Sequence, residues 1–162
     1  MDGDGNALEK LARRALSGEG ANVETRTVFA GIDWKAAGAK PDGALHTVYQ
    51  LLKHMIYWQD WVVAWLDGEN PATPRHAAGS WPREAGPSSR SDWTKTVQQF
   101  RRGLTQLERA CRGADLSSTR GRKSRLEMLL TIGAHNSYHA GQVVFLRQMI
   151  GKWPPPSGGL TW

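Results

Sequence analysis

The chain has 162 residues and a mass of 17.9 kDa, which suits one domain with one hydrophobic core. Hydrophobic residues make up 40% of it and charged residues 22%, so the composition excludes a disordered chain. No apolar run reaches the ~18 residues that a membrane span needs, and the acidic N-terminus is unlike a secretory signal. The single cysteine, Cys111, excludes an internal disulfide framework and indicates a reducing, cytoplasmic location.

The positive charge is concentrated in one segment, residues 101–125. The whole chain has a formal net charge of +6, and this segment carries eight basic residues against two acidic ones. Such a block is typical of a solvated helix end and loop, or of a surface that attracts an anion, for which Arg120, Arg122 and Lys123 are candidates. Because no aromatic residue lies within it, the block lacks stacking surfaces for single strands. A non-catalytic protein of the DNA-damage or stress response that binds nucleic acid through residues 101–125 is therefore only an alternative.

The first two predicted helices lie in the N-terminal half. The first begins at Asn6, which has capping-box spacing to Glu9, and ends at Gly18. The second spans residues 44–66, because neither glycine nor proline interrupts that stretch. Its apolar residues cover much of the helix circumference, which is typical of a helix buried between neighbours.

The other two predicted helices follow in the C-terminal half. The third begins near Asp92, a suitable N-cap, and extends to about Arg112. The last follows the capping-box pair Ser124 and Glu127 and extends to Ile150, before a glycine and a run of three prolines. No strand-like alternation is visible, so the sequence predicts an all-α fold, a four-helix bundle.

Two long connections complete the predicted domain, which spans residues 1–162 with 1–5 and 155–162 at its periphery. The first connection, between the first and second helices, is broken by glycine and proline and allows a short helical piece within 25–35. The second connection, 69–91, contains four prolines, and loops of this length often cover a site. We expect Trp81 in that loop to pack back onto the bundle.

His135 and His139 form the most informative pair in the sequence. Residues four apart share one helix face, so both imidazoles can point at one ion. Their apolar flanks indicate a buried helix, and buried histidines need partners. Small residues on either side, Gly133, Ala134, Ala140 and Gly141, allow a neighbouring helix to come close. The alternative to a metal site is a pair of hydrogen-bonded core histidines.

A third ligand has to come from another helix, and His46 and His54 are the candidates. They are eight residues apart, which separates them by about two turns along the axis and ~80° around it, so they cannot serve the same ion. His54 lies in a buried row with Trp58 and Trp61, whereas His46 lies beside polar residues. We therefore expect His54 to be the third member, with His46 as the solvent-side alternative.

Several segments resemble the DinB/YfiT-like family over nearly the whole chain. The similar segments are Leu45-His46-Thr47, His54 through Asp60, Trp81-Pro82, and His135 through Gln142 with its YHAGQ sequence. The resemblance implies a four-helix bundle in which three histidines, here His54, His135 and His139, bind a divalent metal, often in a dimer. We therefore expect a divalent transition metal, with zinc and nickel as first candidates and iron and manganese as alternatives, and a homodimer.

An open site with three histidine ligands suits an enzyme with a small-molecule substrate, because the ion keeps a position for water or substrate. Many hydrolytic zinc sites use a glutamate directly after the first histidine, and here that position is Asn136. Glu127 and Asp60 lie on other helix faces, so a metal-dependent hydrolase is the alternative rather than the first prediction. Some members of the wider superfamily are thiol S-transferases or thiol-dependent isomerases, and the resemblance favours a metal-dependent transferase that activates a low-molecular-weight thiol.

Other residues are candidates for a pocket around the ion. Tyr57, Trp58 and Trp61 are either walls of an apolar substrate pocket or ordinary core residues. Gln142 either forms a hydrogen bond with a ligand water or an imidazole, or is an ordinary polar residue near a helix interface. Cys111 has no neighbouring histidine, so we expect a small buried residue rather than a nucleophile.

Overall fold

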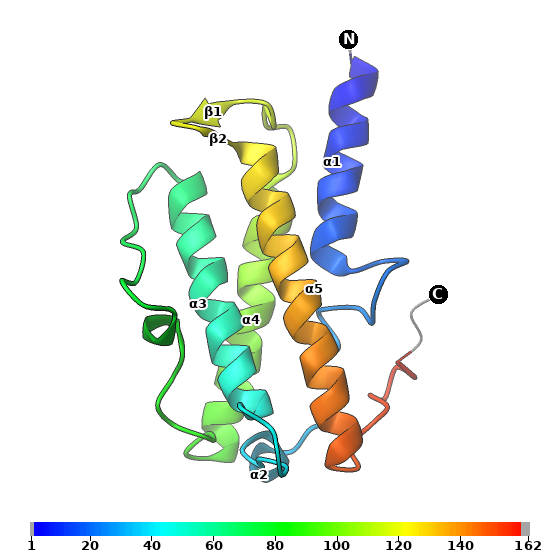
Figure 1. The fold of residues 1–162 in the computed structure, drawn as a ribbon. Helices are drawn as coiled ribbons and strands as arrows, with labels where there is room; N and C mark the ends of the chain where they lie inside the picture. The colour runs from blue at the N-terminus through cyan, green and yellow to red at the C-terminus, as the bar shows by residue number, and fades with distance from the viewer. Residues whose placement is uncertain (1, 160–162) are drawn as a thin grey trace.

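The structure, a computed structural model, describes the backbone of residues 2–159 and the side chains of residues 5–159. Most of the described chain is helical, which confirms the all-α prediction (Figure 1). Four long helices pack along one another, and shorter elements connect them. The long helices are α1 (Asp2–Ser17), α3 (Val48–Leu66), α4 (Arg90–Ala110) and α5 (Arg125–Met149); the short elements are α2 (Trp34–Ala37), the 3-10 helix η1 (Ala77–Ser80), and the strands β1 (Thr119–Arg120) and β2 (Lys123–Ser124).

The first two long helices begin elsewhere than predicted. Asn6 lies inside α1, so its assignment as N-cap is wrong, although the helix does end before Gly18, whose φ is +79°. Helix α3 begins four residues after Ala44, because Thr47 caps it: the Thr47 hydroxyl accepts from the Gln50 amide and the Gln50 side chain accepts from the Thr47 amide. This reciprocal pair satisfies two free donors, which explains the start.

The last two long helices are closer to the prediction. Ser89 caps α4 by accepting from the amide of Asp92, so the helix begins at Arg90 and Asp92 itself lies in its first turn. Ser124 caps α5 by accepting from the amide of Glu127, as predicted. The helix ends at Met149, just before Ile150 and a left-handed glycine.

The short elements correct two expectations. The helical piece expected within 25–35 lies at α2 instead, where the Asp33 carboxylate accepts from the amides of Lys35 and Ala36. The prediction of no strand is wrong for residues 119–124, where β1 and β2 form an antiparallel pair with Gly121 at its turn. Two paired residues in each strand are too few to show alternation in the sequence.

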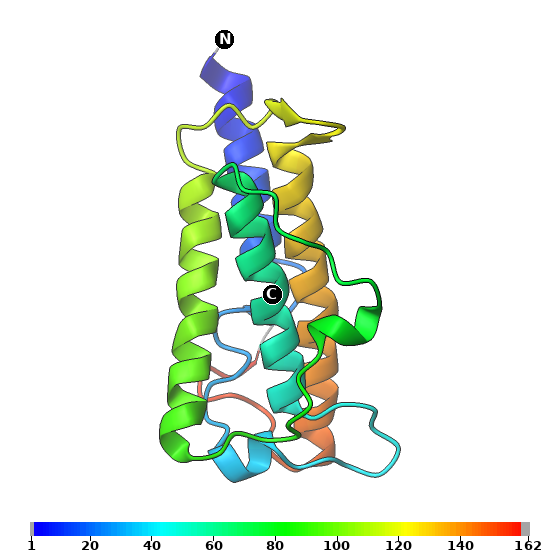
Figure 2. The same cartoon turned by 90° about the vertical axis from the view of Figure 1, so that its left-hand side faces the viewer.

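Helices α3 and α4 run in the same direction, which determines the path of the chain between them. The guanidinium of Arg125, at the start of α5, donates to the carbonyls of Leu66 and Ala110, so the ends of α3 and α4 meet there. The connection after Leu66 must therefore return along the length of these helices before α4 begins. Figures 1 and 2 show it descending on the outer side of α3, with η1 partway down.

The core of the described chain contains two separate apolar clusters. One contains Met55 and Ala140, and the other includes Ile132 and, at its edge, Trp58. Helix α1 approaches α5 closely at Gly133, where a Cβ would lie 2.8 Å from the carbonyl oxygen of Ala15. The helix that approaches this small residue is α1, which supplies none of the candidate ligands. Within residues 2–159, no helix combines the length and the apolar character that a membrane crossing requires.

Candidate metal centre

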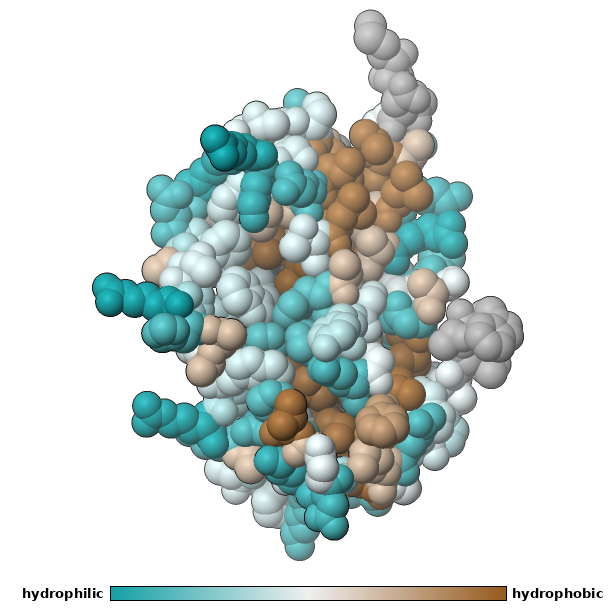
Figure 3. Space-filling view, in the orientation of Figure 1, coloured by the Kyte–Doolittle hydropathy of each residue, from teal (hydrophilic) through white to brown (hydrophobic). Residues whose placement is uncertain are grey.

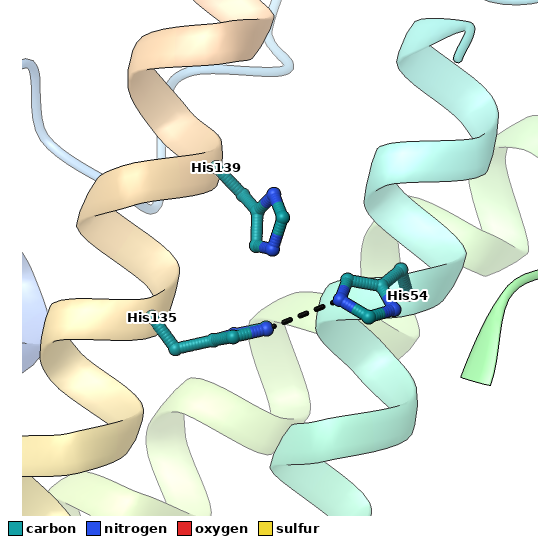
Figure 4. Close-up of side chains that lie close together, drawn as sticks. All are labelled: His54, His135 and His139. Carbon is teal, nitrogen blue, oxygen red and sulfur yellow. Dashed lines mark hydrogen bonds between the residues drawn. The ribbon is translucent and has the colours of Figure 1, made fainter. Parts of the chain in front are cut away.

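Three histidines converge between α3 and α5 (Figure 4). His54 lies on α3, while His135 and His139 lie one turn apart on α5. Each ring offers one nitrogen, and these three nitrogens lie within 4.8 Å of one another. His54 and His139 are buried and His135 is half-buried. The helix geometry predicted this convergence, with His54 rather than His46 as the third member.

A backbone carbonyl determines which nitrogen of His54 carries its proton. His54 Nδ1 lies 3.2 Å from the carbonyl oxygen of Ser80, an atom that can only accept a hydrogen bond. Nδ1 is therefore the donor, and Nε2 keeps its lone pair as an acceptor, hydrogen-bonded to Nε2 of His135. Ser80 lies at the end of η1, in the returning connection. Sequence reasoning missed this contact, since a carbonyl group carries no residue-specific signal.

A glutamine side chain orients His139 in the same way. The Nδ1 of His139 lies 2.7 Å from Oε1 of Gln142, which accepts its proton. Gln142 is three residues further along α5, so both side chains lie on one face of the helix. Nε2 of His139 is therefore left as the unprotonated nitrogen. Of the two roles proposed for Gln142 from the sequence, the structure supports the bond to an imidazole.

The donor set and its spacing fit a divalent transition metal. His135 Nε2 lies 3.2 Å from His54 Nε2. Two nitrogens bound to one tetrahedral zinc at about 2.0–2.1 Å would lie about 3.3 Å apart, which is close to this separation. Among the described residues, the buried Nδ1 of His135 has no hydrogen-bond partner, which leaves a polar group unsatisfied beside the cluster. Three convergent imidazoles are a common ligand set for zinc, nickel and iron.

Burial keeps the three imidazoles neutral at physiological pH. Removal from water, reinforced by the neighbouring imidazoles, lowers the pKa of His54 to about 4, against the hydrogen bond to Ser80, which raises it. The same two causes lower the pKa of His135 to about 4. Burial also lowers the pKa of His139, against the hydrogen bond to Gln142, which raises it. Neutral imidazole is the form that binds a metal, so the protein holds all three in that form.

The loop between α3 and α4 covers one side of the centre through Trp81. The Trp81 ring stacks on His54, with centroids 3.9 Å apart and planes 6° apart. Its other face stacks on His46, with centroids 3.7 Å apart. His46 is therefore separated from the cluster by an indole ring and is not one of the three converging residues. The expectation that Trp81 packs back onto the helices is confirmed.

The aromatic residues of α3 differ in how they approach the cluster. Trp58 contacts the rings of both His54 and His135, with centroids 6.5 and 6.4 Å away. Trp61 and Tyr57 both contact Trp58. Trp61 packs on the apolar cluster that includes Ile132, and its buried Nε1 has no hydrogen-bond partner within residues 5–159. Of the three, Trp58 borders the histidines directly.

Within the basic segment, Arg120 has a structural function. The Arg120 guanidinium donates to the carbonyls of Trp65 and Glu69 and to the side chain of Asn70. These hydrogen bonds connect the β1–β2 hairpin to the end of α3 and the residues that follow it. The guanidinium therefore binds groups of the protein itself. Arg122 and Lys123 are exposed on the hairpin.

The cluster contains no carboxylate among the described residues. Asp60 lies on another side of α3, where it accepts from Gln99 of α4. Asn136, which occupies the place of a catalytic glutamate in the sequence, is fully buried. Cys111 is buried as well and donates to the carbonyl of Leu107, and burial raises the pKa of its thiol to about 11. It is therefore a structural residue, as predicted.

One of the comparisons with known proteins found a match. The family model described as DinB superfamily matches residues 19–143, which include all three histidines. No curated protein and no solved structure matches the chain significantly.

Proposed function

The chain belongs to the DinB superfamily, and from this membership and the histidine cluster we propose that it is a metal-dependent enzyme that activates a low-molecular-weight thiol. His54, His135 and His139 would hold one divalent transition metal, zinc or nickel before iron or manganese. The observation that carries the proposal is the convergence of three neutral imidazoles, two of them with Nδ1 already engaged. Such a site uses three protein ligands and keeps a position for a small molecule.

The surrounding residues prepare the imidazoles for this role. The Ser80 carbonyl and the Gln142 side chain hold His54 and His139 with Nε2 unprotonated, and partners of this kind tune both orientation and basicity. Trp81 shields one face of His54 from water. When bound, a divalent ion would supply Lewis acidity, which favours the deprotonated form of a thiol or of water.

A thiol requires less from the protein than water does. A hydrolase of the HExxH type places a carboxylate beside the reacting water, and the described residues put none in this cluster. Asn136 is fully buried and cannot act as a base. A small thiol, in contrast, reacts directly as a thiolate with an electrophile. A metal-dependent hydrolase is therefore the second candidate, and the three-imidazole set alone supports it.

The remaining parts of the proposal concern assembly and location. We assign the four long helices to the DinB/YfiT type of four-helix bundle and propose a homodimer in the cytoplasm. Arg122 and Lys123 are proposed to attract an anionic thiol, whereas nucleic acid is not proposed as a partner. Salt-dependent binding of a DNA duplex, lost in an Arg122→Ala/Lys123→Ala variant, would contradict this last point.

Elemental analysis of the purified protein after reconstitution with zinc or nickel tests the metal site. We expect one ion per chain in the wild type and loss of the ion in His54→Ala, His135→Ala and His139→Ala. The matched controls are His46→Ala and His76→Ala, which should keep it. A wild-type protein with less than one ion per chain would reject the proposal.

The chemistry is tested on the loaded protein with a small thiol and a chromogenic alkylating agent. We expect metal-dependent consumption of the thiol, absent in His135→Ala. Metal-dependent ester cleavage without a thiol requirement would instead favour the hydrolase.

A further inference from the structure

An apolar groove of about 660 Å³ lies beside the C-terminal half of α5. Among the side chains that the structure describes, six large apolar ones are exposed, and four of these line the groove. They are Leu45, from the segment before α3, and Tyr138, Phe145 and Met149 of α5. Apolar surface also gathers in the lower centre of the space-filling view, over this part of the molecule (Figure 3). Exposed apolar side chains around one concavity indicate a binding site.

The lining identifies the kind of ligand. The chain has a net charge of +6, yet neither lysine nor arginine lines this groove, and its one ionisable carboxylate is that of Asp42. An anionic molecule would therefore find no cation here and would face a negative charge. The volume falls within the ~300–1,000 Å³ range of pockets for small molecules. These features select a neutral, largely apolar small molecule.

One end of the groove borders the histidine cluster. Gln142 is part of the lining, and its Oε1 accepts from Nδ1 of His139. His46 is also part of the lining, and its ring stacks on Trp81, which in turn stacks on His54. Gln142 and His46 therefore lie between the apolar surface of the groove and the histidine cluster. A ligand with a polar end and an apolar body matches this order.

We propose that this groove binds the apolar body of a neutral electrophilic substrate and directs its reactive end toward the histidine cluster. This inference rests on the proposed function, and it assigns the groove to the electrophile because an anionic thiol finds no cation there. Phe145 and Leu45 provide the main apolar contacts. A second copy of the chain is the competing occupant. A groove with polar groups gathered at one end suits a small molecule better than a flat, self-complementary interface.

The first experiment measures binding of N-phenylnaphthylamine, a neutral apolar fluorophore, to the metal-free full-length protein. We expect saturable binding that its sulfonated analogue does not compete for. Phe145→Glu and Leu45→Glu should each weaken binding by about tenfold to a hundredfold, the loss expected when one large apolar contact is removed. Leu130→Glu is the matched control, because Leu130 is an exposed apolar residue of α5 outside the groove, and this variant should bind normally.

The second experiment tests whether the groove leads to the metal. It compares the binding of linear alkyl thiols that differ in chain length. In cobalt-loaded protein, ligation of a thiol gives a sulfur-to-cobalt charge-transfer band. We expect the dissociation constant to fall about fourfold for each methylene that the groove buries. This dependence should disappear in Phe145→Glu and persist in Leu130→Glu.

The outcomes separate the two proposals. If no charge-transfer band forms in any variant, the metal function fails, while fluorophore binding still decides the groove. If the band forms without chain-length dependence, the groove does not serve the metal and the inference is overturned. It is also overturned if the fluorophore does not bind, or binds Phe145→Glu as well as the wild type. A wild-type dimer that becomes monomeric in Phe145→Glu, with no fluorophore binding, would identify a second copy as the occupant.

Discussion

Trp81 lies flat on His54, with ring centroids 3.9 Å apart and planes 6° apart. The two residues come from different parts of the fold, since His54 belongs to α3 and Trp81 to the connection that returns from the end of α3 to the start of α4. Ser80, next to Trp81, accepts the Nδ1 proton of His54. The loop therefore both covers the candidate centre and orients one of its imidazoles.

This stack predicts that Trp81 supports metal binding without touching the metal. In Trp81→Ala the loop loses its main anchor on His54, and we expect zinc affinity to fall about tenfold to a hundredfold, as for other partners of metal ligands. Trp81→Phe keeps an aromatic ring on His54 and should lose much less. Competition with a chelator of known affinity measures the effect. Equal affinity in Trp81→Ala and the wild type would show that the loop only lies over the site.

Gln142 provides a second, independent test of imidazole orientation. In Gln142→Leu the Nδ1 proton of His139 loses its acceptor, so we expect zinc affinity to fall about tenfold to a hundredfold. Gln148→Leu is a matched control, since Gln148 is an exposed residue of the same helix. Zinc titration of both variants by calorimetry gives the comparison. If both bind zinc like the wild type, the Gln142 bond has no part in ligand orientation.

Local spacing in the sequence predicts the histidine cluster better than it predicts the loops. Two histidines four apart share a helix face, and a buried aromatic row places His54 on the inner side of α3. These relationships depend only on helix geometry. The contact of Ser80 with His54 depends instead on α3 and α4 running in the same direction, because only then does their connection pass the cluster. No residue pattern encodes that direction.

The first residue of a helix can be predicted where only one capping residue is available, and not where several are. Ser124 was identifiable because a glutamate follows three residues later, whereas both Asp92 and Ser89 are good caps and only the structure distinguishes them. Asn6 likewise has capping-box spacing, yet the helix continues through it to Asp2. The strands of the β1–β2 hairpin are too short to show an alternation of apolar and polar residues in the sequence. The apolar groove is not visible in the sequence either, because Leu45 and Phe145, which line it, lie far apart along the chain.

Gly133 should tolerate no larger side chain in the contact between α1 and α5. A Cβ there would lie 2.8 Å from the carbonyl oxygen of Ala15, which is backbone and cannot rotate away. We expect Gly133→Val to reduce the free energy of unfolding by about 1–3 kcal/mol through overpacking. Gly141 is the control in the same helix, because a Cβ there would meet nothing within 4 Å. Gly141→Ala should stabilise the protein by about 0.5–1 kcal/mol. Urea denaturation of both variants measures these changes, and equal stability would contradict the close approach of the helices.

The neutral histidines predict a pH dependence of the metal-free protein. The pKa values of His54 and His135 are about 4 in the folded state, against 6.5 in the unfolded chain, so the unfolded chain binds more protons between these values. Stability should therefore be fully present above pH 6.5 and fall as the pH drops toward 4, by up to about 1.4 kcal/mol per pH unit for each histidine.

Urea denaturation in a chelating buffer across this range measures the slope. A His54→Gln/His135→Gln variant should show a flatter dependence, because glutamine does not titrate, whereas His76→Gln, at an exposed loop position, should keep the wild-type slope. Saturating zinc should steepen the dependence, since protons compete with the metal for the same nitrogens. An unchanged slope in the double variant would mean that other groups, and not these two imidazoles, take up the protons on unfolding.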